Sequence, residues 1–441
     1  MEEDLISPLV DDILILIISH LSLKEAITTS VLSHRWRGLW RFTSRLDFDI
    51  TKIKNNLKPK MPLPSLNYSY GFFYGLAEYH SEARRLSLIS RSRLIDSING
   101  VLQSHQAVML DEFTLSFDRD CKDHIDSWLT YALERRVKKL HLNFQSMNCR
   151  YTFSPHFLHN NKLDSITVIR FNQVSVADDV VDLILRLCPF LEVLSLRSSA
   201  TLSHLKVFGP LKHLEILFCR NVKSVEISAK DLVSFKYYGP CAYIIVNDAP
   251  RLVEASIGDN CAFYFLKYMT VFSDSLSRLQ TFKMDLRSIK IIRSYPKFPM
   301  FSDLKHLDLV IDAYDAYDLL CCTSFLMMCP FLHGLKMKIV VLTRWLTGLG
   351  IGRKMKVQKA KPHHYLKMIE LGGFLGSAIN WKLAEHLLKR AVSLEKLIID
   401  PRVASMKYEE ECKNLEKMLA ARARAKHLET SLPPKAELVI L

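Results

Sequence analysis

The stretch Leu191-Glu192-Val193-Leu194-Ser195-Leu196 carries the pattern on which the fold of this 441-residue chain depends: apolar, two residues, apolar, one residue, apolar. Leu194 and Leu196 are two apart, so in a strand they point to the same face. Leu191 lies in the approach to the strand and can pack along the same core. Because a single strand cannot bury that face alone, several copies must stack side by side.

The same pattern returns along most of the chain. Four early copies begin at successive intervals of 27, 26 and 28 residues, at Leu110, Val137, Leu163 and Leu191. Five later copies begin 25, 28, 34 and 28 residues apart, at Leu279, Leu304, Leu332, Leu366 and Leu394. A period of about 20–29 residues is typical of leucine-rich repeats, in which each unit supplies one strand and one helix or turn.

Segments with helical patterning separate several copies, over residues 123–135, 178–187, 316–328 and 381–391. Between residues 202 and 237 the copies start only 9 to 11 residues apart, which leaves room for strands and tight turns but not for helices. The pattern predicts an α/β solenoid with parallel strands on the concave face and helices and turns on the convex face, thinner in the middle. The alternative is a generic α/β domain with coincidental leucines.

The first 50 residues carry a different signal. Ile13, Ile17 and Leu21 recur every four residues, behind Asp11 and Asp12, whose carboxylates favour a helix N-terminus. We therefore expect an apolar first helix that is buried on more than one side.

Two further short helices are expected in this module. The sequence Ser22-Leu23-Lys24-Glu25 has the form of a capping box. Trp36 and Trp40 are four apart and would share one face of a third helix. Units below ~40 residues rarely fold without a disulfide, a metal or a partner. The segment is therefore either a docking module that completes its burial on another protein or the N-terminal cap of a globular core.

The same segment resembles the F-box of plant proteins of the F-box, leucine-rich-repeat and FBD class. That family reads Leu-Pro-Asp-Asp, then an apolar helix, then a stretch close to Ser-Val-Leu-Ser-x-Arg-Trp-Arg-x-Leu-Trp. Residues 30–40 match the second part nearly letter for letter, and Leu9, Asp11 and Asp12 match the first. Val10 stands where the family usually has proline, and His20 replaces a customary aromatic residue.

The resemblance implies a non-catalytic, substrate-recognition subunit of an SCF-type Cullin-RING ubiquitin ligase. Its F-box would dock on a Skp-type adaptor, and through it on Cullin and RING subunits, while the solenoid binds an unidentified protein substrate. The adaptor-binding residues carried over are Leu9, Val10, Ile13, Ile17, Leu21, Val31, Leu32 and Trp36. Trp36 and Trp40 can instead belong to the core of the module. A ligase-independent leucine-rich scaffold is the alternative, which the departures at Val10 and His20 keep open.

The expected domain order follows from these signals. It comprises an F-box over residues 1–50, a linker and the entry to the solenoid over 51–109, leucine-rich repeats over 110–345, FBD-like terminal repeats over 346–402, and a charged C-terminal helix and tail over 403–441. The FBD resemblance rests on residues 364–371 and 394–401, which frame an amphipathic helix. We expect the final helix, over 407–428, to lie on the surface or fray.

Composition restricts the remaining function classes. The acidic start of the chain argues against a signal peptide, and the longest strongly apolar run, residues 13–18, is too short to span a membrane. Ten cysteines in a chain of this length are no disulfide scaffold, and Cys321-Cys322 and Cys329 lack partners at metal-ligand spacing. We expect a soluble protein of the cytoplasm and/or nucleus with reduced thiols, no cofactor and no metal.

Two features have open interpretations. The tetrapeptide Cys-Pro-Phe-Leu occurs at residues 188–191 and again at 329–332, where proline ends a helical segment and cysteine fills a small buried site. A redox or metal role for these cysteines is the alternative. The glycine-rich stretch 348–354 lacks the spacing and the Ser or Thr of a phosphate loop, so a flexible connection is expected.

The net charge is +14. The densest basic run is formed by Arg353, Lys354, Lys356, Lys359 and Lys361, and another by Arg422, Arg424 and Lys426. Each is interpreted as a solvated face or, alternatively, as a nuclear-import signal or a nucleic-acid contact. No aromatic platform for base stacking accompanies the second run, so nucleic-acid binding is not expected. No constellation of nucleophile, base and acid is present that would indicate an enzyme.

Overall fold

The computed structural model describes residues 6, 8–49, 92–117, 122–144, 151–159, 161–262, 277–287, 300–312, 323–340, 362–402 and 411–441. It divides into two compact units, Met1–Thr201 and Leu202–Leu441. The expected glycine-rich connection at 348–354, the basic run at 353–361 and Cys321-Cys322 lie outside the described residues.

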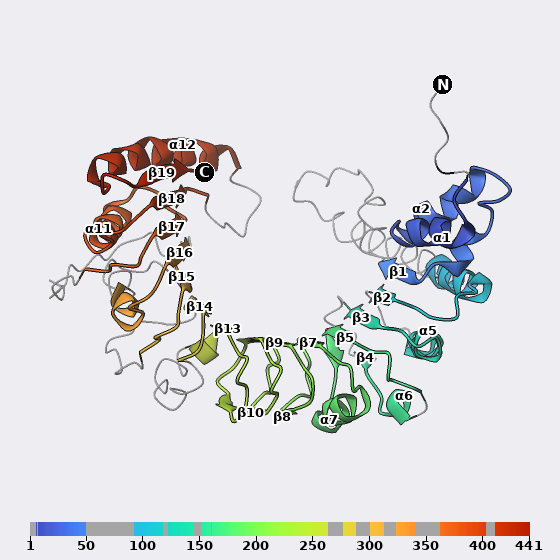
Figure 1. The fold of residues 1–441 in the computed structure, drawn as a ribbon. Helices are drawn as coiled ribbons and strands as arrows, with labels where there is room; N and C mark the ends of the chain where they lie inside the picture. Colours follow the sequence, from blue (N-terminus) through green and yellow to red (C-terminus); the bar gives the residue numbers. More distant parts are fainter. Residues whose placement is uncertain are drawn as a thin grey trace, which may run out of the picture. The chain divides into compact units, whose positions relative to one another are not determined.

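The first unit combines a small helical module with the first part of a parallel sheet (Figure 1). The module contains helices α1 (Asp11–Ser19) and α2 (Leu23–Thr28) and the 3-10 helices η1 (Thr29–Val31) and η2 (Leu39–Phe42). The strands follow in the order β1 (Arg45–Asp49), β2 (Glu112–Phe117), β3 (Lys139–Phe144), β5 (Val168–Asn172) and β7 (Val193–Arg197). Helices α5 (Lys122–Glu134), α6 (His156–His159) and α7 (Asp178–Leu187) lie on one side of this sheet, and β4 (Tyr151–Thr152) pairs with β6 (Val174–Ser175).

The repeat pattern sets the register of these strands. Phe113, Leu140, Ile169 and Leu194 are lateral neighbours across four parallel strands, and all four are buried. The face that carries them packs toward the helices, so the alternate residues form an open face of the sheet. The predicted α/β solenoid with parallel strands is confirmed.

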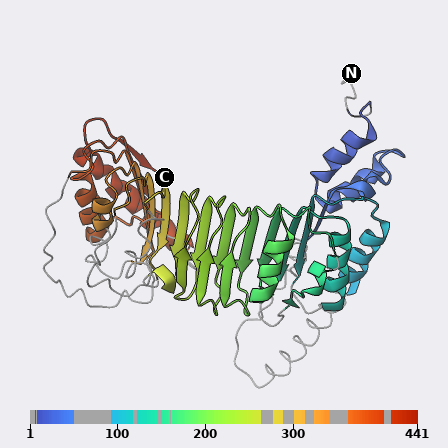
Figure 2. The same cartoon turned by 60° about the horizontal axis from the view of Figure 1, so that its bottom comes forward.

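The second unit has the same construction with a longer run of parallel strands (Figure 2). Its strands follow in the order β9 (His213–Leu217), β11 (Ser234–Tyr238), β13 (Glu254–Gly258), β14 (Thr281–Asp285), β15 (His306–Asp312), β16 (Gly334–Val340), β17 (Met368–Gly372), β18 (Lys396–Asp400) and β19 (Glu437–Ile440). Its helical elements are η4 (Thr323–Met328), α11 (Ala378–Leu388), α12 (Glu411–Lys426) and η7 (His427–Ser431).

The crowded copies in the middle build two layers rather than one. Copies starting at Leu211 and Leu232 lead into β9 and β11 of the large sheet. Copies starting at Leu202 and Val222 lead into β8 (His204–Val207) and β10 (Ser224–Ile227), which form a second sheet with β12 (Tyr243–Val246). The second sheet takes the place of the helices, and no helix occurs between residues 202 and 258, all of which the structure describes.

Two expectations need correction. The third helix expected around Trp36 and Trp40 does not form, because residues 34–38 are turns, Gly38 has a φ of +123°, and only the short η2 follows. Of the helix expected over 316–328, the described part is the 3-10 helix η4. Residues 45–49, in the segment expected as the F-box, form the first strand of the sheet, and residues 92–104, in the expected linker and entry to the solenoid, form a helix.

The charged C-terminal helix is also better packed than expected. Ala421, Ala425 and Leu428 are fully buried. The Arg422 Nε donates to the carbonyl of Leu441 at 3.0 Å, and the chain after the helix forms strand β19 instead of a tail. Arg422 thus holds the end of the chain while its side chain remains exposed on the surface.

Candidate functional site

The N-terminal module has a small core of its own. Leu14, Ile18, Ala26 and Leu39 are buried together, and Leu9, Ile15, Trp36 and Trp40 pack against them. The two tryptophans therefore meet at one cluster although they share no helix.

Large apolar side chains remain exposed on the opposite side of α1. Val10 is 63% exposed, Leu16 55%, and Ile13 and Ile17 42% each. At 100° per residue these four positions fall within one third of the helix circumference, so they form a continuous stripe. Two further exposed pairs of the module are Leu21 with Ile27 and Val31 with Leu32, the last two at 81% and 64%.

The stripe contains three of the eight residues carried over from the F-box resemblance, and three more are exposed elsewhere in the module. Six of the eight are exposed: Val10, Ile13, Ile17, Leu21, Val31 and Leu32. Leu9 and Trp36 are half-buried against the core, so the structure places them where they support the surface from behind. Leu16 belongs to the exposed stripe but was not among the eight residues carried over. The sequence did hold a signal for it, because the apolar residues of the first helix extend beyond a single stripe.

Arg35 fixes the start of α1. Its guanidinium contacts the Asp11 carboxylate at 2.8 Å and also donates to the carbonyl of Leu9. Both charged groups are substantially exposed, so the ion pair itself contributes at most about 1 kcal/mol. Its structural effect is to hold Leu9 and Val10 at the helix entrance. This contact gives the Arg-Trp-Arg segment a role that its sequence alone did not reveal.

The predicted capping box begins α2. The Ser22 hydroxyl accepts from the Glu25 N–H at 3.4 Å, and the Glu25 carboxylate accepts from the Ser22 N–H at 2.9 Å and from its hydroxyl at 2.7 Å. These hydrogen bonds, led by the one from the hydroxyl, lower the pKa of Glu25. The turn between α1 and α2 is therefore fixed locally.

The module is joined to the sheet by direct hydrogen bonds. The Ser44 N–H donates to the Ser19 hydroxyl at 3.1 Å, and the buried His105 bridges the Thr43 carbonyl (2.8 Å) and the Tyr131 hydroxyl (2.7 Å). Burial lowers the pKa of His105. The neutral ring therefore donates from Nε2 to the carbonyl and accepts at Nδ1 from the tyrosine.

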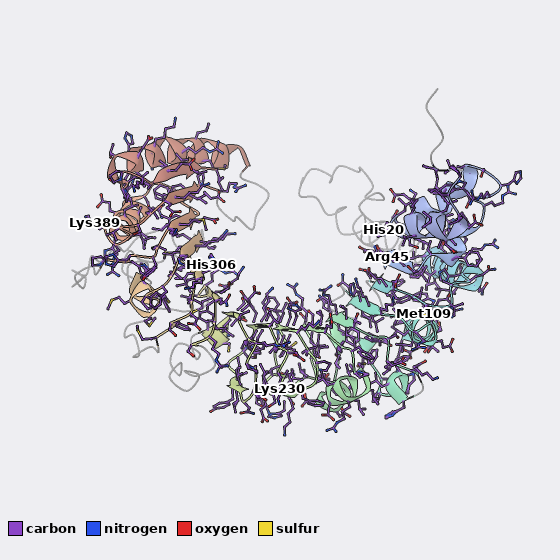
Figure 3. All side chains as sticks on the ribbon, viewed as in Figure 1. His20, Arg45, Met109, Lys230, His306 and Lys389 are labelled. Atoms are coloured by element: carbon purple, nitrogen blue, oxygen red, sulfur yellow. The ribbon has the colours of Figure 1, made fainter. Side chains whose placement is uncertain are left out.

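Strand β1 continues this attachment because it pairs with β2 along five residues, from Arg45 with Glu112 to Asp49 with Ser116. The Arg45 guanidinium also donates to Nδ1 of His20 at 3.4 Å (both residues are labelled in Figure 3). His20, which departs from the family pattern, thus contacts the first strand of the sheet.

The open face of the sheet is polar in both units. In the first, Asn172 donates to Asn143 at 2.6 Å, and Asn143 donates to Ser116 at 3.3 Å. In the second, lysine and carboxylate pairs bridge neighbouring strands: Lys236–Glu215 at 3.5 Å, Lys283–Asp308 at 3.1 Å and Lys336–Glu370 at 2.6 Å. Such a face suits a folded or extended protein ligand better than an apolar small molecule.

The duplicated cysteines are structural. Burial raises the pKa of the Cys188 and Cys329 thiols to about 12, so both are protonated near neutral pH and are poor nucleophiles or ligands. Within the described ranges, no three His, Cys, Asp or Glu residues are grouped as a metal site would require. Nor does any described helix combine the length and apolar character needed to cross a membrane.

A module of short helices on the end of a ladder of parallel strands defines an F-box protein with leucine-rich repeats. A family model of the F-box domain matches residues 6–46, and a model described as the At1g61320/AtMIF1 LRR domain matches 101–180 and 161–440. The chain therefore belongs to the plant F-box, leucine-rich-repeat and FBD family.

Relatives from Arabidopsis thaliana extend over nearly the whole chain. F-box/FBD/LRR-repeat protein At4g26340 is 26% identical and covers 90% of this chain and 93% of its own length. Putative F-box/FBD/LRR-repeat protein At3g49030 is 25% identical over 96% of this chain and 94% of its own. F-box/FBD/LRR-repeat protein At4g00160 is 26% identical over 90% and 86%.

Proposed function

We propose that this chain is a non-catalytic substrate receptor of an SCF-type ubiquitin ligase. The exposed stripe of α1, together with Leu21, Val31 and Leu32, docks on a Skp-type adaptor, which connects to Cullin and RING subunits. The solenoid binds a protein substrate in the cytoplasm and/or nucleus and raises its effective concentration at the ubiquitin-conjugating enzyme.

The exposure of the α1 stripe carries this proposal. A module with a core of four small and medium side chains leaves Val10, Ile13, Leu16 and Ile17 in solvent although each is strongly apolar. Contiguous exposed apolar surface of this kind marks sites of protein–protein contact. Had the module been only a cap, these side chains would have faced the strands.

Co-purification of the full chain with a Skp-type adaptor tests the proposal. Ile17→Asp places a charge within the stripe and should weaken adaptor retention by on the order of tenfold or more, because a carboxylate buried there without a partner is costly. Val108→Asp is the matched control, since Val108 is 84% exposed and lies outside the module. Thermal unfolding should show both variants folded.

Wild-type protein that fails to retain the adaptor at micromolar concentration would overturn the proposal and favour the ligase-independent scaffold. Equal losses from Ile17→Asp and Val108→Asp would show that the stripe is not the docking surface.

A further inference from the structure

Two exposed aromatic rings meet at the edge of the sheet where β16 and β17 begin. Phe331 is 39% exposed and Tyr365 46%, and their ring centroids lie 5.1 Å apart in an edge-to-face arrangement. Each occupies the same position of its repeat, directly before the buried Leu332 or Leu366. The repeat geometry therefore holds the rings side by side on the surface while the leucines that follow fill the core.

Positively charged and imidazole groups surround these rings. The Lys305 Nζ lies 5.6 Å from the Phe331 ring centroid, and the His333 ring lies 6.5 Å from that of Tyr365. Backbone hydrogen bonds fix the row, since the His333 N–H donates to the Lys305 carbonyl at 2.9 Å and the Lys367 N–H to the His333 carbonyl at 2.9 Å. Partial desolvation, followed by the charges of Lys305 and Lys367 and the neighbouring His306, lowers the pKa of His333.

The same surface extends onto the open face through Gly334. A Cβ at that position would lie 2.8 Å from His306 Nδ1 and 3.6 Å from Met368 Cε, so these two side chains close over the buried glycine from either side. His306 is labelled on this face in Figure 3. We call the residues Lys305, His306, Phe331, His333, Tyr365 and Met368 the aromatic patch.

Charge favours an acidic occupant. Neither Lys305 nor His306 forms an ion pair with any residue that the structure describes, whereas Lys367 is paired with Glu395 at 2.9 Å. One row further into the open face, the lysines are already paired with Asp308 and Glu370. A long polyanion crossing the strands would meet these carboxylates, so the patch is suited to a short acidic segment and not to a nucleic-acid strand.

We propose that the aromatic patch binds a short acidic peptide segment of a partner protein, anchored by an aromatic side chain of that segment. The anchor packs on Phe331, Tyr365 and Met368, and the flanking carboxylates meet Lys305 and the imidazoles. The proposal rests on the proposed function in treating the solenoid as a receptor for proteins, and it does not involve the F-box stripe.

The test uses the full chain and a fluorescein-labelled twelve-residue peptide, Asp-Glu-Phe-Asp repeated three times, in a fluorescence anisotropy titration at low salt. Binding should be lost when Lys replaces the acidic residues of the peptide and weakened when Ala replaces its Phe. The double variant Phe331→Ala/Tyr365→Ala should weaken binding roughly tenfold, and Lys305→Glu by a similar factor, as expected for central aromatic and charged contacts.

The chain offers matched controls. Phe190 belongs to the identical Cys-Pro-Phe-Leu tetrapeptide of another repeat and is 61% exposed, so Phe190→Ala should leave binding unchanged. Lys206→Glu makes the same charge change at an exposed position of β8 and should also leave it unchanged. Both control variants and both test variants should unfold at the wild-type temperature.

Three results would overturn the inference: no peptide binding by the wild-type chain, equal weakening by Phe190→Ala, or tighter binding of labelled oligouridylate that the same patch substitutions abolish. Adaptor retention measured on the same samples separates the two proposals. Retained adaptor with no peptide binding rejects the aromatic patch alone, and the reverse result rejects the docking of α1.

Discussion

Leu14 and Leu16 lie two positions apart on α1 and have opposite environments, the first fully buried and the second 55% exposed. Leu14→Ala should lower the free energy of unfolding by about 2–5 kcal/mol, because it leaves a cavity in a small core. Leu16→Ala should change it by less than about 0.5 kcal/mol and should weaken adaptor retention instead. Denaturant unfolding and co-purification measure the two effects, and equal stability losses would contradict this assignment.

His105 should make the stability of the first unit depend on pH. Burial lowers its pKa in the folded state, so the unfolded chain takes up a proton at a higher pH than the folded chain does. The free energy of unfolding should therefore fall as the pH drops below about 6.5, the ordinary histidine value. In His105→Gln the dependence should be shallower. Urea unfolding between pH 7.5 and 5.5 measures it, and an unchanged slope would contradict the neutral bridge.

At the scale of elements, the close approach of α12 to the turn before α11 gives a stringent test. Gly376 has a φ of +67°, and a Cβ there would lie 2.7 Å from Arg424 Cδ. Gly376→Ala should cost about 1–3 kcal/mol through strain and displacement of Arg424. Gly100→Ala is the control, since a Cβ at Gly100 meets nothing within 4 Å and alanine favours the helix over 92–104. Thermal unfolding should separate the two, and equal effects would refute the packing described.

Sequence periodicity predicted the repeat strands well, because the alternation of apolar residues along each strand determines which side chains face the core. It could not show that copies such as Leu211 and Val222 belong to opposite sheets, since the same apolar spacing serves both. The third F-box helix failed for a local reason, the left-handed Gly38. The family motif named Val10, Ile13 and Ile17 of the exposed stripe but not Leu16, and the half-buried positions of Leu9 and Trp36 could be assigned only once the packed core was known.

For the molecule as a whole, the segment 411–441 should protect the end of the ladder. Strand β19 pairs with β18, and Leu428 is buried beside the helices. Its removal exposes the apolar edge formed by Leu397 and Ile399, so a chain ending at residue 402 should self-associate. Size-exclusion chromatography with light scattering checks this, with Arg422→Ala in the full chain as the control that stays monomeric. A monomeric truncation of unchanged thermal stability would refute the protective role.

The pairing of β1 with β2 and the hydrogen bonds of His105 to Thr43 and Tyr131 attach the N-terminal helices firmly to the early strands. An adaptor bound to α1 would then hold those strands in a fixed orientation relative to itself. The lysines of a substrate bound to these strands would then lie at a fixed distance from the ubiquitin-conjugating enzyme. Which lysine receives the modification would thus be decided by spatial placement as much as by affinity.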